Sequence, residues 1–433
     1  FGLGNIDIID SVKIIWNDKE FSILKNIKPN SHHTFNEDKI DKNFIIHKKS
    51  TYKTYLKTSD NQINYSHNEN NFVDFDRERL LFKMSSNEGP CTCVGDFNDD
   101  GREDLFIGSA KGQASIIFFQ ELNGSFKSYN SAFEEDILSE DINCLVDDFN
   151  GDGKLDLIVA SGGSEYSNFS PELRDRMYIN LGNKNFKKLT ESLSSISSFE
   201  STSTISSYDF DRDGDKDLFL GTRINPGAYG TKTRSYLLEN NGEGVFKDIS
   251  EKYLGDSRFM EMITDSEFVD IDNDNIKELV VVGEWMPVKI FKFLENKLID
   301  ITDSLGLSKT NGLYNNVHFE DLDGNGYTDL VLGNYGLNSM FRASIEQPLS
   351  LYVNDFDNNG RIEQILAMHY DEKLYPIVQL KDLWMQIPSL KKKYLKFENY
   401  KNVTMEKLFD TSIIKESEVK KVYNLSSVSL YNK

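Results

Sequence analysis

Short apolar runs, each bounded by turn-forming residues, alternate along the chain with acidic segments. Residues 105–108 (Leu-Phe-Ile-Gly) and 218–221 (Leu-Phe-Leu-Gly) are two such runs, and runs of this length are typical of buried β-strands. Residues 204–208 and 350–353 predict further strands on the amino-terminal side of an acidic segment. The pattern therefore predicts a repeated unit that consists of a strand, a polar loop and a second strand.

The polar loop is a nine-residue sequence that occurs six times. Its copies begin at Asp96, Asp148, Asp209, Asp270, Asp321 and Asp355. Each copy has oxygen-bearing side chains at positions 1, 3, 5 and 9 and an apolar residue at position 2. Position 6 is Gly in five copies and Asn275 in the other. Because these two residue types tolerate a positive φ best, position 6 is predicted to turn sharply.

The oxygen pattern makes each loop a candidate calcium site, since Ca²⁺ takes about six to eight oxygen ligands. The loops are not EF-hands, because position 12 is apolar in all six copies where an EF-hand has a bidentate Glu. We expect several Ca²⁺ ions, up to six, with the fourth site weakest because Asn275 and Glu278 stand at positions 6 and 9. The predicted metal residues, which include position 7, are Asp96, Asn98, Asp100, Arg102, Asp104, Asp148, Asn150, Asp152, Lys154, Asp156, Asp209, Asp211, Asp213, Asp215, Asp217, Asp270, Asp272, Asp274, Ile276, Glu278, Asp321, Asp323, Asn325, Tyr327, Asp329, Asp355, Asp357, Asn359, Arg361 and Glu363.

The spacing of the loops predicts the architecture. The loops begin 52, 61, 61, 51 and 34 residues apart, and periods of this size are typical of propellers and solenoids. A second hairpin signal follows the loop at residues 121–126, 178–186 and 238–246. Two strands around each loop and two around this hairpin form the four-stranded blade of a β-propeller. We predict an all-β propeller with one loop per blade, seven blades when complete, and an irregular blade after Asp321.

Three regions are expected along the chain. Residues 1–50 form a small β domain, residues 51–90 a linker that ends in a docking segment at 71–75, and residues 91–433 the propeller. The propeller carries a short helical insertion near residues 380–410, where apolar residues follow Pro388 at helical spacing.

Two further expectations concern the ends of the chain. Residues 6–16 and 20–27 read as strands around a turn at Asn17-Asp18. The strand-like residues 425–431 end the chain where a further hairpin would be expected, so the last blade is predicted to be open.

Charge and cysteine content narrow the class of protein. The formal net charge is −21 and the isoelectric point about 4.8, which disfavours nucleic acid as a partner because phosphates need a basic surface. No apolar run approaches the ~20 residues of a membrane span. Cys91, Cys93 and Cys144 are odd in number, and we expect them to be small buried strand residues without a disulfide framework.

The first residues resemble a known domain. Residues 1–4, 9–16 and 24–30 are similar to the second half of an ASPIC/UnbV domain, which is found in cartilage acidic protein and in many bacterial surface proteins. The usual Trp-Pro is Trp16-Asn17 here. The missing front half of this domain and the lack of an initiator Met predict that the chain is part of a larger polypeptide.

The six loops resemble FG-GAP/VCBS repeats, the calcium-loop propeller repeats also seen in integrin α chains. Residues 234–238, 283–287 and 333–338 are similar to the large FG-GAP/ASPIC proteins of Bacteroidota. The resemblance implies a calcium-stabilised propeller that is extracellular, on the cell surface or periplasmic. It does not imply one function, because one fold serves many.

Two function classes follow. In the first, the ions are structural and a protein or glycan ligand binds to loops of the propeller face. Arg223, Tyr229 and Trp285 are then the candidate contacts, because Arg, Tyr and Trp are common in recognition surfaces. The alternative is a polysaccharide lyase-like enzyme, which needs a proton acceptor in a funnel. None of the six His residues stands in a nucleophile or zinc motif, so we expect a non-catalytic binding or scaffold module.

Overall fold

The computed structural model describes residues 5–16, 21–35, 63–196, 200–294 and 297–433. The chain forms two compact units, residues 1–61 and 62–433. In the described part of the first unit, β1 (Ile9–Ile15) pairs antiparallel with β2 (Phe21–Ile27). The two strands predicted at 6–16 and 20–27 are confirmed, whereas the predicted turn at Asn17-Asp18 lies outside the described residues.

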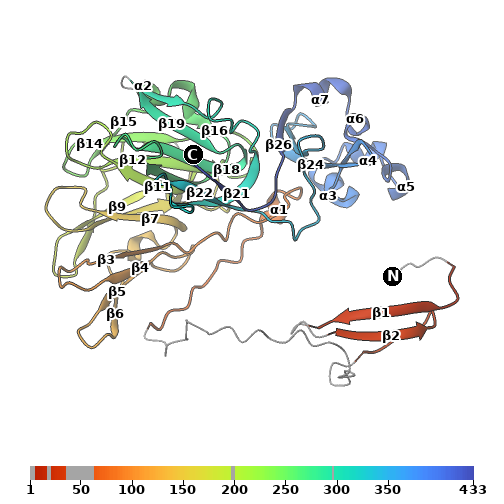
Figure 1. Cartoon of the computed structure of the whole chain (residues 1–433), viewed down its shortest axis with the longest axis horizontal. Helices are drawn as coiled ribbons and strands as arrows, with labels where there is room; N and C mark the ends of the chain where they lie inside the picture. Colours follow the sequence, from red (N-terminus) through yellow and green to blue (C-terminus); the bar gives the residue numbers. More distant parts are fainter. Residues whose placement is uncertain (1–4, 17–20, 36–62, 197–199, 295–296) are drawn as a thin grey trace. The chain divides into compact units, whose positions relative to one another are not determined.

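The second unit contains three regular four-stranded antiparallel sheets, which are the first three blades (Figure 1). In each sheet the strands lie side by side in the order in which they occur along the chain, and an acidic loop connects the first strand to the second. They consist of β3 (Thr92–Gly95), β4 (Asp104–Ile107), β5 (Ile116–Gln120) and β6 (Phe126–Tyr129); β7 (Asp141–Asp147), β8 (Asp156–Ser161), β9 (Arg176–Asn180) and β10 (Phe186–Lys188); and β11 (Ser201–Tyr208), β12 (Asp217–Ile224), β14 (Tyr236–Asn240) and β15 (Phe246–Asp248).

The fourth and fifth blades are joined. The fourth consists of β17 (Ile263–Val269), β18 (Glu278–Met286), β19 (Lys289–Leu294) and β20 (Lys297–Asp300). The fifth has β21 (Gly312–Glu320) and β22 (Asp329–Asn334), and its third strand is β27 (Val428–Leu430), which comes from the end of the chain. A short pairing of β18 with β21 connects the two blades. The predicted irregular blade is therefore the fifth, and residues 428–430 supply its third strand. Three strands of this blade are described, which agrees with the expectation of an open blade.

The sixth sheet has a different strand order. It contains β23 (Leu349–Asn354), β24 (Glu363–Tyr370), β25 (Lys373–Pro376) and β26 (Glu418–Val422), in the spatial order β25-β24-β23-β26. Between β25 and β26 the chain forms five short helices: α3 (Leu380–Gln386), α4 (Leu390–Lys393), α5 (Phe397–Tyr400), α6 (Met405–Leu408) and α7 (Thr411–Glu416). They bury Leu383, Ile387 and Leu408 against the sheet residues Ile365 and Ala367. The helical insertion predicted at 380–410 is confirmed and extends to Glu416.

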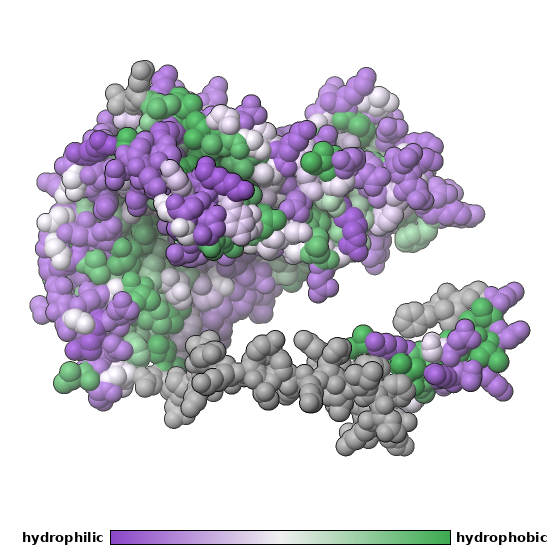
Figure 2. Space-filling view, viewed as in Figure 1, coloured by the Kyte–Doolittle hydropathy of each residue, from purple (hydrophilic) through white to green (hydrophobic). Residues whose placement is uncertain are grey.

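Contacts between sheets make the arrangement radial. The first strands of successive blades are neighbours: β3 contacts β7, β7 contacts β11, β11 contacts β17, and β17 contacts β21. Neighbouring blades share buried apolar side chains, whereas the face of this unit seen in Figure 2 is mainly hydrophilic. The predicted all-β propeller with one loop per blade is confirmed. Six blades with a loop are present among the described residues of 63–433, and seven blades for a complete domain stays a prediction.

The segment before the first blade packs into the middle of the unit. α1 (Asp74–Arg77) lies within it, and the Asp74 carboxylate, 2% exposed, accepts hydrogen bonds from the amides of Ser85 and Ser86 and from the Ser164 hydroxyl. Further along, Phe82 makes edge contacts with the rings of Tyr229 and Trp285 at centroid distances of 6.0 and 6.2 Å. Residues 51–62 of the predicted linker lie outside the described residues.

One cysteine prediction is wrong. Cys93 on β3 forms a disulfide with Cys144 on β7, so a covalent bond joins the first two blades. The two residues are 51 apart in sequence and become neighbours only because the first strands of successive blades lie side by side. Cys91 is free and buried, as expected.

Candidate metal centres

The main chain of each acidic loop curls around the carboxylate at position 1. In all six loops this Asp accepts a hydrogen bond from the amide of position 6. In the sixth loop, for example, the Asp355 carboxylate accepts from the amides of Asn359 at 2.9 Å and Gly360 at 2.7 Å. The side chain at position 5 in turn accepts from the amide of position 7, as Asn359 does from Arg361 at 2.8 Å. These bonds fix the side chains of positions 1 and 5 on the inner side of the loop.

Two positions in each loop have a left-handed backbone. At position 6, φ is +81° to +106° for the five Gly residues and +66° for Asn275, as the sequence predicted. Position 4 also has a positive φ in every loop, which the sequence analysis missed. The residues there are Asp99, Gly151, Arg212, Asn273, Gly324 and Asn358. Five of these six residues are Gly, Asn or Asp, the types that adopt a positive φ most readily, so the composition of position 4 could have predicted this turn.

The carboxylate at position 9 is at most 1% exposed in every loop. It accepts a hydrogen bond from the amide of position 2, at 2.9 to 3.2 Å. In the four loops where position 9 is Asp, its other oxygen accepts from an amide at the end of the blade's third strand. Position 9 therefore fixes the loop to its own blade, in addition to any role as a metal ligand.

An asparagine at the end of the third strand of a blade links the position 9 carboxylate to the loop of the preceding blade. The amide of Asn240 donates to Asp217 of its own blade at 2.9 Å, while its side chain donates to the carbonyl of Phe149 in the preceding loop at 3.0 Å. Asn180 makes the corresponding bonds one blade earlier. Asn432, which follows β27, binds the fifth and fourth loops in the same way. The loops are thus part of the contacts between blades.

Carboxylate oxygens from positions 1, 3 and 9 converge in four loops. One oxygen from each residue lies within 4.8 Å of the others, and two ligands at 2.3–2.6 Å from one ion are at most about 5 Å apart. The groups are Asp209, Asp211 and Asp217; Asp270, Asp272 and Glu278; Asp321, Asp323 and Asp329; and Asp355, Asp357 and Glu363. The first two loops have Asn98 and Asn150 at position 3, which offer an amide oxygen. These acidic clusters can hold metal ions.

Several loop oxygens are buried without a hydrogen-bond partner among the described residues. They are Oδ1 of Asn98, Oδ1 of Asp209 and Asp215, Oδ1 of Asp357 and Oε1 of Glu363. Buried polar atoms in folded proteins are nearly always paired, and an unpaired buried anion is costly. A bound cation would satisfy the atoms at positions 1, 3 and 9, so the donor set fits a hard metal ion such as Ca²⁺.

The electrostatics agree with this fit. Burial, together with the neighbouring carboxylates, raises the pKa of Asp217 to about 7 and that of Glu363 to about 7. The same causes raise the pKa of Asp156 and of Asp215 to about 6. The carboxylates of a metal-free loop therefore repel one another, and a divalent ion would remove that repulsion.

The side chain at position 7 differs from loop to loop. It is Arg102, Lys154, Asp215, Ile276, Tyr327 or Arg361. Since Arg, Lys and Ile side chains do not coordinate cations, position 7 could serve as a ligand common to all loops only through its main-chain carbonyl. The Lys154 ammonium instead pairs with Asp152 at 2.8 Å, and Arg102 pairs with Asp100.

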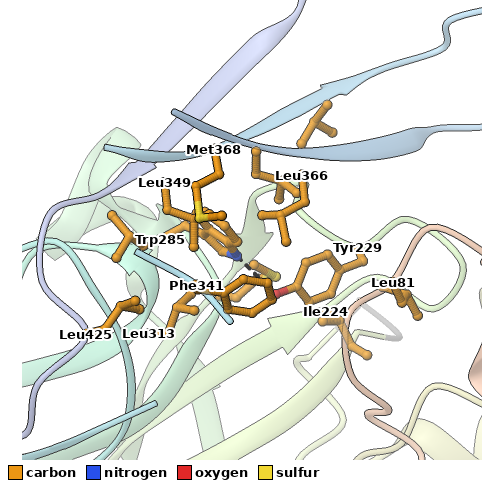
Figure 3. Packing of buried hydrophobic residues seen from close by; sticks show 14 residues of the cluster. Leu81, Ile224, Tyr229, Trp285, Leu313, Phe341, Leu349, Leu366, Met368 and Leu425 are labelled. Atoms are coloured by element: carbon orange, nitrogen blue, oxygen red, sulfur yellow. Dashed lines mark hydrogen bonds between the residues drawn. The ribbon is translucent and has the colours of Figure 1, made fainter. Parts of the chain in front are cut away.

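The predicted recognition residues are not on the surface. Arg223, Tyr229 and Trp285 are 8%, 2% and 2% exposed, so the expectation of an exposed contact patch is wrong. Tyr229 and Trp285 belong to the central apolar cluster, where the Trp285 Nε1–H donates to Tyr229 Oη at 3.0 Å (Figure 3).

Two of these residues, Arg223 and Tyr229, contact the carboxylate of Glu284, which is 1% exposed. Arg223 and Lys83 form ion pairs with its carboxylate, and Arg223 also pairs with Glu88. Burial acts to raise the pKa of Glu284, but Lys83 and Arg223 outweigh it and hold that pKa at about 2. Arg223 and Tyr229 thus bind a buried anion, and Trp285 donates to Tyr229; the sequence did not predict this cluster.

Among the helices of residues 63–433 and of the other described segments, none has the length and apolar character needed to cross a membrane.

Comparisons with known proteins identify two segments of the chain. Residues 148–220 match the family described as FG-GAP-like repeat, and residues 1–42 match ASPIC and UnbV. Curated proteins gave no significant match. Solved structures that match include that of the Dos1 propeller, at 11% sequence identity and a TM-score of 0.32. That match covers 57% of this chain and 64% of the Dos1 propeller chain. The chain thus carries an FG-GAP-like repeat and an ASPIC/UnbV segment.

Proposed function

We propose that this chain is a calcium-binding β-propeller that acts outside the cytoplasm as a non-catalytic binding or scaffold module for protein or glycan ligands. The observation that carries the calcium part is the convergence of carboxylate oxygens from positions 1, 3 and 9 in four loops, together with buried oxygens that lack a partner in the first, third and sixth loops. All of the side-chain donors are oxygens, and Ca²⁺ accepts the irregular geometry of such loops more readily than Mg²⁺, which demands near-ideal octahedral coordination.

The disulfide supports the location. Disulfides persist in secreted, periplasmic and cell-surface proteins and are rare in the reducing cytosol, and Cys93–Cys144 is a bond between blades rather than a pair within one hairpin. Weak calcium modules with Kd values of about 10⁻⁴–10⁻³ M are also used in extracellular proteins. Fractionation of the native protein tests this proposal, and recovery in the cytosol would contradict it.

The binding role needs a surface other than the one predicted. Because Arg223, Tyr229 and Trp285 are buried, ligand contacts must come from other, exposed residues. An array of glycans and proteins would identify the ligand. Incubation with acidic polysaccharides tests the absence of catalysis: release of unsaturated products would support the lyase-like alternative.

Calcium binding is tested by equilibrium dialysis and by thermal unfolding with and without EGTA. We expect several bound ions and a lower Tm in EGTA, because ligand that binds only the folded state adds about 2.7 kcal/mol per site at a hundredfold excess over Kd. Asp357→Ala should lower the calcium content by one ion, because it removes the ligand oxygen that Asn98 and Asn150 provide in the first two loops. Asp256→Ala, an exposed change outside the loops, is the matched control. A Tm that EGTA leaves unchanged argues against the proposal.

A further inference from the structure

The fourth loop holds a cation of the protein itself. Lys292 lies on β19, next to the strand that begins with Glu278 at position 9. Its Nζ is 2.8 Å from Oδ2 of Asp274 and 3.1 Å from Oε1 of Glu278, and it also pairs with Asp272. One ammonium group therefore contacts positions 3, 5 and 9 of the loop, which are three of the four side chains that would bind a metal ion.

No other loop has a lysine in this place. Leu279 pairs with Phe291, so Lys292 stands opposite Glu278. In the first, second, third and fifth blades, the register of the second and third strands also shows which residue stands opposite position 9. The pairs Leu105–Phe118, Leu157–Tyr178, Leu218–Leu238 and Leu330–Leu430 place Phe119, Ile179, Glu239 and Tyr431 there. The sixth blade has no equivalent, because β25 pairs with β24 only from Ala367 onward.

The basic residues of other loops are arranged differently. Arg102 and Lys154 stand at position 7 of their own loops, and each pairs with the single carboxylate at position 5. Their charged groups leave positions 1, 3 and 9 open. Lys292 enters from a different strand, its side chain is only 18% exposed, and the Glu278 it contacts is fully buried.

An ammonium group and a divalent ion cannot share one centre. To reach Asp272, Asp274 and Glu278, an ion would have to displace Lys292 from three charge-assisted contacts and then lie beside a positive charge. We propose that Lys292 closes the fourth loop in place of a metal ion, so that the chain binds one divalent ion fewer than it has loops. This inference rests on the proposed calcium function. In the fourth blade, the ammonium group of Lys292 would neutralise the loop carboxylates that a metal ion neutralises in the other blades.

The test compares the calcium content of purified variants after equilibrium dialysis against Ca²⁺. Wild type should bind five ions and Lys292→Met six, because Met has a similar length and no charge. Lys289→Met is the matched control: Lys289 lies on the same strand but pairs with Asp300 at 2.9 Å, so this variant should bind five ions. Equal contents in wild type and Lys292→Met would overturn the inference.

A second pair of variants decides the matter if Lys292→Met does not fold. Asp211 and Asp272 occupy position 3 of the third and fourth loops. Asp211→Ala should lose one ion, whereas Asp272→Ala should retain the wild-type content. Loss of an ion in Asp272→Ala, or six ions in wild type, would overturn the role of Lys292 and leave the proposed calcium function intact. If wild type and all variants bind no Ca²⁺, the proposed function itself fails.

Discussion

The hydroxyl group of Tyr229 donates a hydrogen bond of 2.6 Å to Oε2 of Glu284. Tyr229 follows β12 of the third blade and Glu284 lies in β18 of the fourth, so the bond joins two blades in the interior. Hydrogen bonds to charged groups are worth roughly twice as much as neutral ones. The pair therefore belongs to the stability of the propeller and not to a surface for ligands.

Tyr229→Phe should lower the free energy of unfolding by about 1.5–3 kcal/mol, the usual contribution of a hydrogen bond to a charged group. Urea unfolding in saturating Ca²⁺ measures this loss. Tyr370→Phe removes a hydroxyl from a side chain that is 52% exposed and should have little effect. Equal losses in the two variants would show that the Tyr229–Glu284 bond contributes nothing specific.

Removal of the Cys93–Cys144 disulfide should lower the free energy of unfolding by about 2–4 kcal/mol, because the bond closes a long loop of the unfolded chain. The double variant Cys93→Ala/Cys144→Ala and reduction of wild type should give the same loss of Tm. Cys91→Ala keeps the disulfide, and its Tm should still fall on reduction. A reductant that leaves the Tm of wild type unchanged would contradict this prediction.

Gly326→Ala should destabilise the fifth loop through the backbone alone. Gly326 has φ +87°, and a Cβ atom there would meet no other atom within 4 Å. The left-handed conformation costs an L-residue about 1–2 kcal/mol. Gly326→Asn should cost less than Gly326→Ala, because Asn tolerates this region and stands at the same position in the fourth loop. The reverse order would exclude backbone conformation as the reason for Gly.

Glu140 should make stability depend on pH. Its side chain is 0% exposed, and burial, together with the charges of Glu165, Glu69 and Asp141, raises its pKa from 4.5 to about 8. The folded protein therefore holds this proton more tightly than the unfolded chain does. The free energy of unfolding should fall as the pH rises from about 4.5 to about 8.

Glu140→Gln removes that charge and keeps one acceptor for the Lys111 amide, which donates to Glu140 at 3.0 Å. The variant should exceed wild type in stability at pH 8.5 by on the order of 2–4 kcal/mol, and the difference should vanish near pH 4.5. Saturating Ca²⁺ keeps the acidic loops in one state during the measurement. Glu135→Gln, an exposed change, is the control, and parallel pH profiles for Glu140→Gln and wild type would refute the assignment.

Local chemistry made most of the blade predictable from the sequence. The strand, acidic loop and strand follow from apolar runs on either side of Asp355 and Gly360, because the positive φ and the curled carboxylate at these positions are properties of a few adjacent residues. The helical insertion could be predicted for the same reason. Each of these signals lies within about ten residues of chain.

What the sequence did not predict depends on residues that are far apart along the chain. Cys93 and Cys144 meet only after two blades have packed, and Trp285 is buried because residues 80–88 fill the centre of the unit. The position of Lys292 within the fourth loop required the register of β18 with β19. Periodicity does not carry this information, since each case is decided by which strands become neighbours.

The pairing of β27 with β22 has a consequence for the order of events during synthesis. Residues 329–334 leave the ribosome about a hundred residues before Val428. The edge of β22 that pairs with β27 therefore stays unpaired while the sixth sheet and its helices are synthesised. Asn432, which supplies the last bonds to Asp329 and to the carbonyl of Ile271, emerges later still. Open strand edges invite pairing with other chains. The first three blades can therefore form as they are translated, whereas the fifth acquires its third strand only after translation has passed Asn432.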